Sequence, residues 1–177
     1  ASLASYDDKP GQLAKSEYRD EGWQLESVTG INTSSQAEFI VLHKKAVEEH
    51  PARYILAIAG TVDKKDIKSD LRTRSVPFHR EDGAESGREI PSVHKGFDDY
   101  ARTILQTDLG KKTVADTLSS LIANREAELL VTGHSLGGAA AVLIGARMAD
   151  RGYSPGDIHI ISFGAPAVGN QAFADAY

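Results

Sequence analysis

Ser135 stands in a context typical of a catalytic nucleophile, the run Gly133-His134-Ser135-Leu136-Gly137. A serine hydroxyl is a weak nucleophile until a fold presents it to a base and to donors for the developing oxyanion. The pattern G-x-S-x-G does this at a sharp strand-to-helix turn, where the glycines allow close backbone approach. On this motif alone, a Gly-Ser loop that merely joins a strand to a helix remains the alternative.

The residues around this motif predict the elements that would position the serine. An apolar run over 129–132 precedes it and predicts a buried strand, while the small residues over 138–144 predict a helix. Two further apolar runs ended by glycine, 53–60 and 157–163, predict core strands of a parallel sheet. Residues 23–28 alternate like an edge strand. Residues 37–43 suit a strand or the start of an amphipathic helix, and we favour a strand paired with 53–60.

Helices are predicted after Gly96, after Thr113 as a capping residue, and after Ser135 as far as Gly152. Strands that alternate with helices indicate an α/β layered fold. The segment 62–93 differs, because it is balanced in charge and interrupted by proline and glycine. A connection of this length in a compact domain is typical of a lid or of a disordered loop.

The composition of the 177 residues excludes several functions. A net charge of −5 argues against binding to nucleic acid, and the absence of cysteine excludes disulfides and thiolate chemistry. No cofactor or metal is implied, and we interpret the acidic residues Asp63, Asp66 and Asp70 as a solvated face. The compartment and the oligomeric state are left open, with a secreted or cell-envelope protein favoured over a cytoplasmic one.

Four motifs occur in order: Ala59-Gly60-Thr61, Val93-His94-Lys95-Gly96-Phe97, the serine motif, and Phe163-Gly164-Ala165-Pro166-Ala167-Val168-Gly169-Asn170. Together they resemble the class 3 (fungal-type) lipases, a family of α/β-hydrolases, from about Tyr54 to the end of the chain. The resemblance implies an α/β-hydrolase fold with a mostly parallel sheet and helices on both faces.

The resemblance also implies roles for individual residues. Ser135 would be the nucleophile, and the backbone N–H groups of Leu136 and Thr61 would bind the oxyanion. Residues 62–93 would be the lid, of which Asp66-Ile67 and Asp70-Leu71 look like the start. Ala59 departs from the family pattern, which often has arginine there, without removing an oxyanion donor.

The triad acid and base are not found in this sequence. In α/β-hydrolases they follow the serine, and the family places the acid well beyond the Phe163–Asn170 motif. His94 precedes the serine, His134 points away from it along the turn, and His159 lies inside a predicted strand. We therefore expect residues 1–177 to be a single domain that is incomplete at its C-terminus, with the triad Asp and His outside it.

The predicted function is that of a lipase or carboxylesterase acting through an acyl-serine intermediate. The alternatives are a non-catalytic hydrolase-fold fragment or binding module, and a thioesterase or acyltransferase on the same fold. The expected partner is an ester or lipid substrate, and transient contact with a lipid–water interface is a further expectation. The modest apolar content of the segment 62–93 suggests short or moderately long acyl chains.

Overall fold

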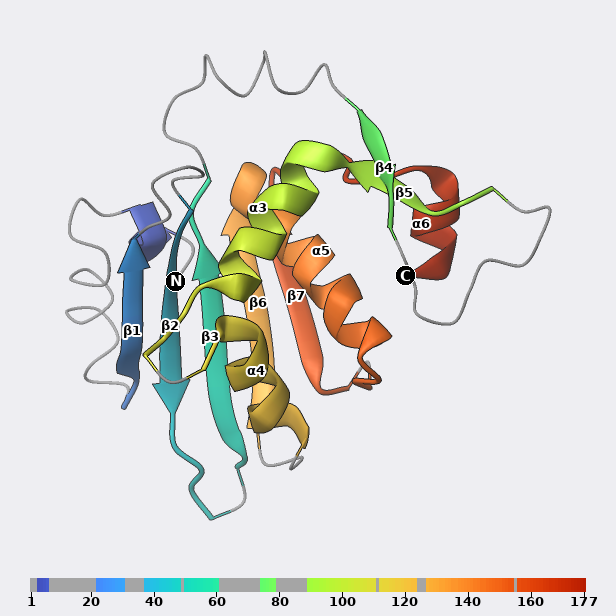
Figure 1. Ribbon diagram of the computed structural model, residues 1–177. Coiled ribbons are helices and arrows are strands. Elements are labelled where there is room, and N and C mark those ends of the chain that lie inside the picture. The colour runs from blue at the N-terminus through green and yellow to red at the C-terminus, as the bar shows by residue number, and fades with distance from the viewer. Residues whose placement is uncertain are drawn as a thin grey trace.

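The computed structural model describes residues 3–6, 22–30, 37–48, 50–60, 74–78, 89–110, 112–123, 127–154 and 156–177 (Figure 1). Its elements, in chain order, are η1 (Leu3–Tyr6), β1 (Gln24–Gly30), β2 (Glu38–Lys44), β3 (Ala52–Ile58), β4 (Ser75–Pro77), β5 (Ser92–His94), α3 (Lys95–Gln106), α4 (Val114–Ala123), β6 (Ala127–His134), α5 (Leu136–Asp150), β7 (Ile158–Phe163) and α6 (Gln171–Ala176). The predicted strands and helices are all present, and the ambiguous segment 37–43 forms strand β2, which pairs with β3 as expected.

The main sheet has the strand order β1-β2-β3-β6-β7. Strands β3, β6 and β7 run parallel, whereas β1–β2 and β2–β3 are antiparallel. The expectation of a mostly parallel sheet is therefore corrected to a mixed sheet. The reason is the length of the connections, because the short link between β2 and β3 can form only a hairpin and a parallel crossover needs a dozen residues or more.

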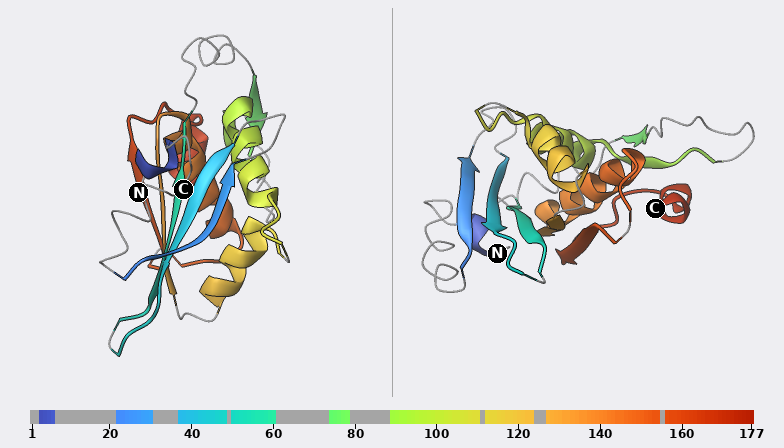
Figure 2. Two further views of the ribbon diagram at one scale, coloured as in Figure 1. Left: turned by 90° about the vertical axis from the view of Figure 1, so that its left-hand side faces the viewer. Right: turned by 90° about the horizontal axis from the view of Figure 1, so that it is seen from below.

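Helices α3, α4 and α5 lie together on one face of the sheet (Figure 2). Their buried side chains meet the sheet residues Phe39, Val41, Leu56, Ile58 and Val131 in one core cluster. A second cluster on the opposite face, with Ile40, Leu42 and Ala57 at its centre, contains no helical residue. In the described ranges the three α-helices thus cover one face of the sheet, and the short 3-10 turn η1 lies against the other face.

Local sequence explains where these helices begin and end. Helix α3 buries one stripe that includes Phe97, Tyr100 and Ile104, the spacing of an amphipathic helix. Thr113 caps α4, because its hydroxyl oxygen accepts a hydrogen bond from the backbone N–H of Asp116 at 3.1 Å. After α5, Gly152 adopts a φ of +87°, as is common at a helix C-terminus. None of the helices in the described ranges is long and apolar enough to span a membrane.

The expected lid, residues 62–93, is described only at 74–78 and 89–93. These parts form an antiparallel ribbon in which β4 pairs with β5 and the N–H of Phe78 donates to the carbonyl of Pro91 at 2.8 Å. Asp63, the pair Asp66-Ile67 and the pair Asp70-Leu71 lie outside the described residues.

Candidate active site

Ser135 lies at the carboxyl end of strand β6, immediately before helix α5. Its backbone has φ 55° and ψ −121°, a conformation that residues other than glycine rarely adopt. Its N–H donates to the carbonyl of Phe163 at 2.9 Å, which fixes the turn to the end of the neighbouring strand β7. Strain of this kind is concentrated at functional sites, and here it presents the serine at the top of the sheet.

The glycines of the motif allow strand β6 and helix α5 to meet without side chains between them. A Cβ at Gly133 would lie 2.3 Å from the carbonyl carbon of Gly137, and one at Gly138 would lie 2.9 Å from the Cβ of Ala165. Neither site can hold a side chain without movement of the backbone or of the loop after β7. The spacing G-x-S-x-G-G is therefore required by packing at this turn.

The candidate oxyanion site lies between the start of α5 and the end of β3. Leu136 is the first residue of α5, so its backbone N–H is among those that have no carbonyl partner inside the helix. A Cβ at Gly60 would lie only 3.5 Å from this nitrogen and 2.7 Å from the carbonyl oxygen of His134. Thr61, the second expected donor, directly follows Gly60 but lies outside the described residues.

Three of the histidines in the described part of the chain were candidates for the base. His94 precedes α3, where its ring packs on Phe97 at 4.4 Å and both ring nitrogens are buried without a partner. His134 turns toward Tyr6, and His159 is exposed on β7. No hydrogen bond joins any of them to Ser135 within the described ranges. The described residues thus include the candidate nucleophile and one candidate oxyanion donor, and none of their histidines forms a hydrogen bond with Ser135.

Tyr6 is a residue near the site that sequence reasoning missed. Its hydroxyl donates to the carbonyl oxygen of His134 at 3.2 Å and lies 3.3 Å from the His134 Nδ1. Tyr6 belongs to the single turn η1, more than a hundred residues before the serine. A turn of four residues has no periodic pattern, so no sequence signal marked this contact.

Asn170 gives the last of the four motifs a structural role. Its Oδ1 accepts from the N–H of Phe173 at 3.0 Å, which caps α6, and from the N–H of Ser92 at 2.9 Å. Its Nδ2 donates to the Glu89 Oε1 at 2.9 Å and to the Ile90 carbonyl at 3.0 Å. One side chain therefore ties the loop after β7 to the ribbon strand β5.

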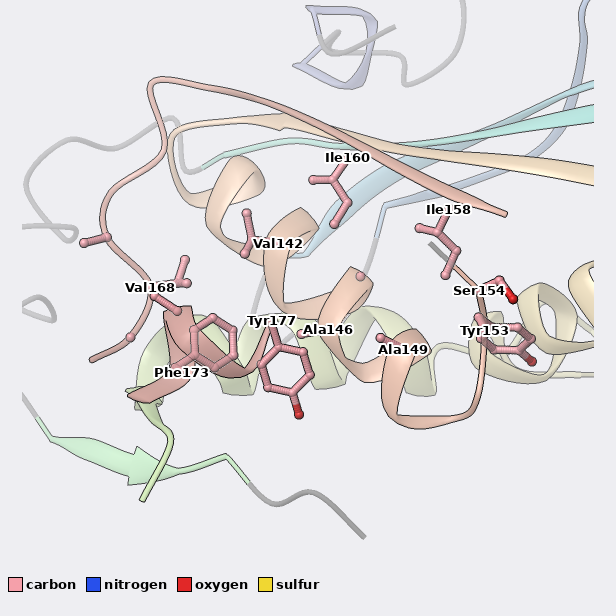
Figure 3. Close-up of a pocket in the computed structure, with 14 residues that line it drawn as sticks. Val142, Ala146, Ala149, Tyr153, Ser154, Ile158, Ile160, Val168, Phe173 and Tyr177 are labelled. Carbon is pink, nitrogen blue, oxygen red and sulfur yellow. The ribbon is translucent and has the colours of Figure 1, made fainter. Parts of the chain in front are cut away.

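A cavity of about 530 Å³ opens between α5, β7 and α6 (Figure 3). Its walls are apolar, with Val142, Ile158, Ile160, Val168 and Phe173 among the lining side chains. Among the described residues that line it, there is neither Ser135 nor Leu136, and no histidine or carboxylate side chain. The cavity therefore has no part in the candidate active site.

Comparison with known proteins places the chain among lipases. The sequence profile of the family described as lipase (class 3) matches residues 55–177. A curated relative, the toxin TseL of Vibrio cholerae serotype O1, is 33% identical over 88 residues, which cover 48% of this chain and 12% of the toxin.

Two solved structures resemble the fold over 98% of the chain. One is a triacylglycerol lipase whose catalytic centre is a serine protease triad, with a TM-score of 0.71 and 23% identity. The other is the triacylglyceride lipase of Rhizomucor miehei, with a TM-score of 0.70 and 22% identity. The chain spans 62% of the length of each. The likeness shows the α/β-hydrolase fold.

Proposed function

Because the chain belongs to the class 3 lipase family, whose profile matches residues 55–177, we propose that it carries the nucleophile of a serine ester hydrolase. The observation that carries the proposal is the strained backbone of Ser135 between β6 and α5. In this reaction the Ser135 Oγ attacks the ester carbonyl carbon, the alcohol leaves, and water then releases the acid from the acyl-serine.

The oxyanion of each tetrahedral intermediate would be held by two backbone N–H groups. We assign these to Leu136 and to Thr61, the residue after Gly60. A Cβ placed on Gly60 would lie 3.5 Å from the Leu136 nitrogen, so the end of β3 is close to the first N–H of α5. This closeness supports the assignment of the two donors. A donor supplied by the residue after the nucleophile, together with one from a neighbouring strand end, is the usual construction in this fold.

We place the triad Asp and His outside these 177 residues. Two observations support this: no hydrogen bond joins a described histidine to Ser135, and the similar solved lipases are longer than this chain.

We further propose that residues 62–93 form a lid and that the substrate is an ester or lipid of short to moderate acyl length. Hydrolysis of p-nitrophenyl esters from acetate to palmitate, below and above their solubility limits, tests this range.

The decisive experiment replaces the nucleophile in the full natural protein. Ser135→Ala should abolish hydrolysis of p-nitrophenyl butyrate and covalent labelling by a fluorophosphonate probe. Ser154→Ala is the matched control, because Ser154 is exposed in the loop beyond the far end of α5 and its replacement should leave both signals unchanged. Retained hydrolysis in Ser135→Ala would refute the assignment. Labelling of the wild type without ester turnover would favour a thioesterase or acyltransferase, and no labelling would favour a binding module.

A further inference from the structure

We propose that Tyr6 is a positioning residue for the oxyanion hole, joining the end of strand β3 to the turn that carries Ser135. The inference deepens the proposed function and rests on it. The starting observation is that three groups from η1, the serine turn and α5 surround the position of a Cβ at Gly60. A Cβ at Gly60 would lie 2.4 Å from the Tyr6 hydroxyl, 2.7 Å from the His134 carbonyl oxygen and 3.5 Å from the Leu136 nitrogen.

The Tyr6 hydroxyl connects the two sides of this gap. It donates to the His134 carbonyl at 3.2 Å, one residue before the nucleophile. Burial raises the pKa of Tyr6 above its ordinary value of 10.0, while a backbone hydrogen bond from Gly60 acts in the opposite direction. The phenol therefore keeps its proton at neutral pH and donates to the turn, while its oxygen lies against the strand end at Gly60.

A second tyrosine holds the same strand end from the helical face. Tyr100 of α3 donates its hydroxyl to the Ala59 carbonyl at 2.9 Å, and the Ala59 N–H donates to the Glu38 carbonyl at 2.9 Å. His134 and the buried residue Val131 point to opposite faces of β6, so Tyr6 approaches from the face opposite α3. The backbone that leads into Thr61 is thus held by one phenol on each side.

This arrangement has a catalytic consequence. Oxyanion donors act only when they lie about 2.7–3.1 Å from the position that the oxyanion will occupy. The position of the Leu136 N–H relative to the end of β3 depends on how closely Gly60 approaches the serine turn. Removing the Tyr6 hydroxyl loses the bridge across this gap but keeps the ring, so the donors would be held less tightly. An interaction of this kind is realised in the transition state more than in substrate binding.

The test compares Tyr6→Phe with wild type in the full natural protein, with Tyr153→Phe as the matched control. Tyr153 lies beyond the far end of α5, about 20 Å from Ser135 along a helix of this length. We expect Tyr6→Phe to lower kcat about tenfold, which is less than the loss of a whole oxyanion donor costs, with KM changed less than twofold. The Ki of an alkylboronic acid, which forms a tetrahedral adduct on the serine, should rise by the same factor.

Each outcome decides the inference. Equal falls in kcat and in boronic acid affinity, with the melting temperature little changed, would support a positioning role. A lower melting temperature with unchanged kcat and Ki would make Tyr6 merely structural and overturn it, as would no change in any of them. If Ser135→Ala keeps its activity, the proposed function itself fails. If Ser135→Ala is inactive while Tyr6→Phe equals wild type, only this inference fails.

Discussion

The backbone of Gly137 in α5 lies directly against the carbonyl oxygen of Ile58, the last residue of β3. A Cβ at Gly137 would be 2.3 Å from that oxygen and 2.9 Å from the carbonyl carbon of Ala59. Helix α5, which follows Ser135, therefore packs directly against the end of β3, just before Thr61 in the sequence. Through this contact, one glycine of the serine motif sets the distance between α5 and the end of β3, the two elements that flank the proposed oxyanion site.

Gly137→Ala should therefore impair both folding and activity. The added methyl group must push α5 away from β3, and overpacking of this kind typically costs about 1–3 kcal/mol. Urea unfolding followed by circular dichroism measures the loss, and ester hydrolysis should fall with it. Gly156→Ala is the control, because nothing lies within 4 Å of a Cβ there. Equal stability of the two variants would contradict the packing argument.

Asp98 should contribute far more to stability than its neighbour Asp99. Asp98 is only 3% exposed, and its carboxylate accepts from the Arg102 Nε at 2.7 Å and from Arg147 of α5. Removal of the carboxylate in Asp98→Ala leaves the partly buried Arg147 without its partner, and such losses cost about 3–5 kcal/mol. Asp99→Ala breaks an exposed pair with Lys95 and should cost about 1 kcal/mol or less.

Urea denaturation of the two single variants decides this prediction. A loss for Asp98→Ala no larger than that for Asp99→Ala would show that the buried ion pair does not hold α3 against α5. The double variant of Asp98 and Arg147 to alanine should lose less than the sum of the two single changes, because the residues share one interaction.

Asn170→Ala should release the ribbon from the loop after β7. The substitution removes the cap of α6 and the hydrogen bonds to Glu89, Ile90 and Ser92, for an expected loss of about 1–2 kcal/mol. Hydrogen exchange of the Ser92 and Phe173 amides should quicken. Gln171→Ala is the control, since this exposed side chain bonds only Asp175 among the described residues. Unchanged exchange at Ser92 would refute the link.

Tyr100 should make the fold sensitive to high pH. Burial raises its pKa from 10.0 to about 12, so the unfolded chain loses the phenol proton before the folded one does. The contribution of Tyr100 is therefore complete below pH 10 and is lost as the pH rises from 10 to about 12, by at most about 3 kcal/mol. In Tyr100→Phe, the fall in the free energy of unfolding between pH 9 and pH 12 should be smaller than in wild type. An identical fall would contradict the assignment.

Much of this fold follows from local pattern. The strands and helices have the periods and terminators that the sequence displays, and Ser135 lies at the predicted turn between strand and helix. The hairpin of β2 and β3 was also predicted, whereas the strand that pairs with β1 was not, because such pairing depends on elements that meet through tertiary contacts. Tyr6 and Asn170 act through contacts with residues 128 and 78 positions away, and no local signal encodes such partners.

The order of pairing in the sheet also bears on how the molecule folds. Strand β3 reaches its antiparallel partner β2 through a short turn, where Lys44 pairs with Arg53, whereas its parallel pairing with β6 brings Arg53 beside Glu128, 75 positions away. Closing the longer loop costs more chain entropy, so we expect the hairpin to form first and the β3–β6 pairing to limit the folding rate. Ser135 and Gly60 lie on opposite sides of that late pairing, and during refolding the catalytic geometry should be among the last features to appear.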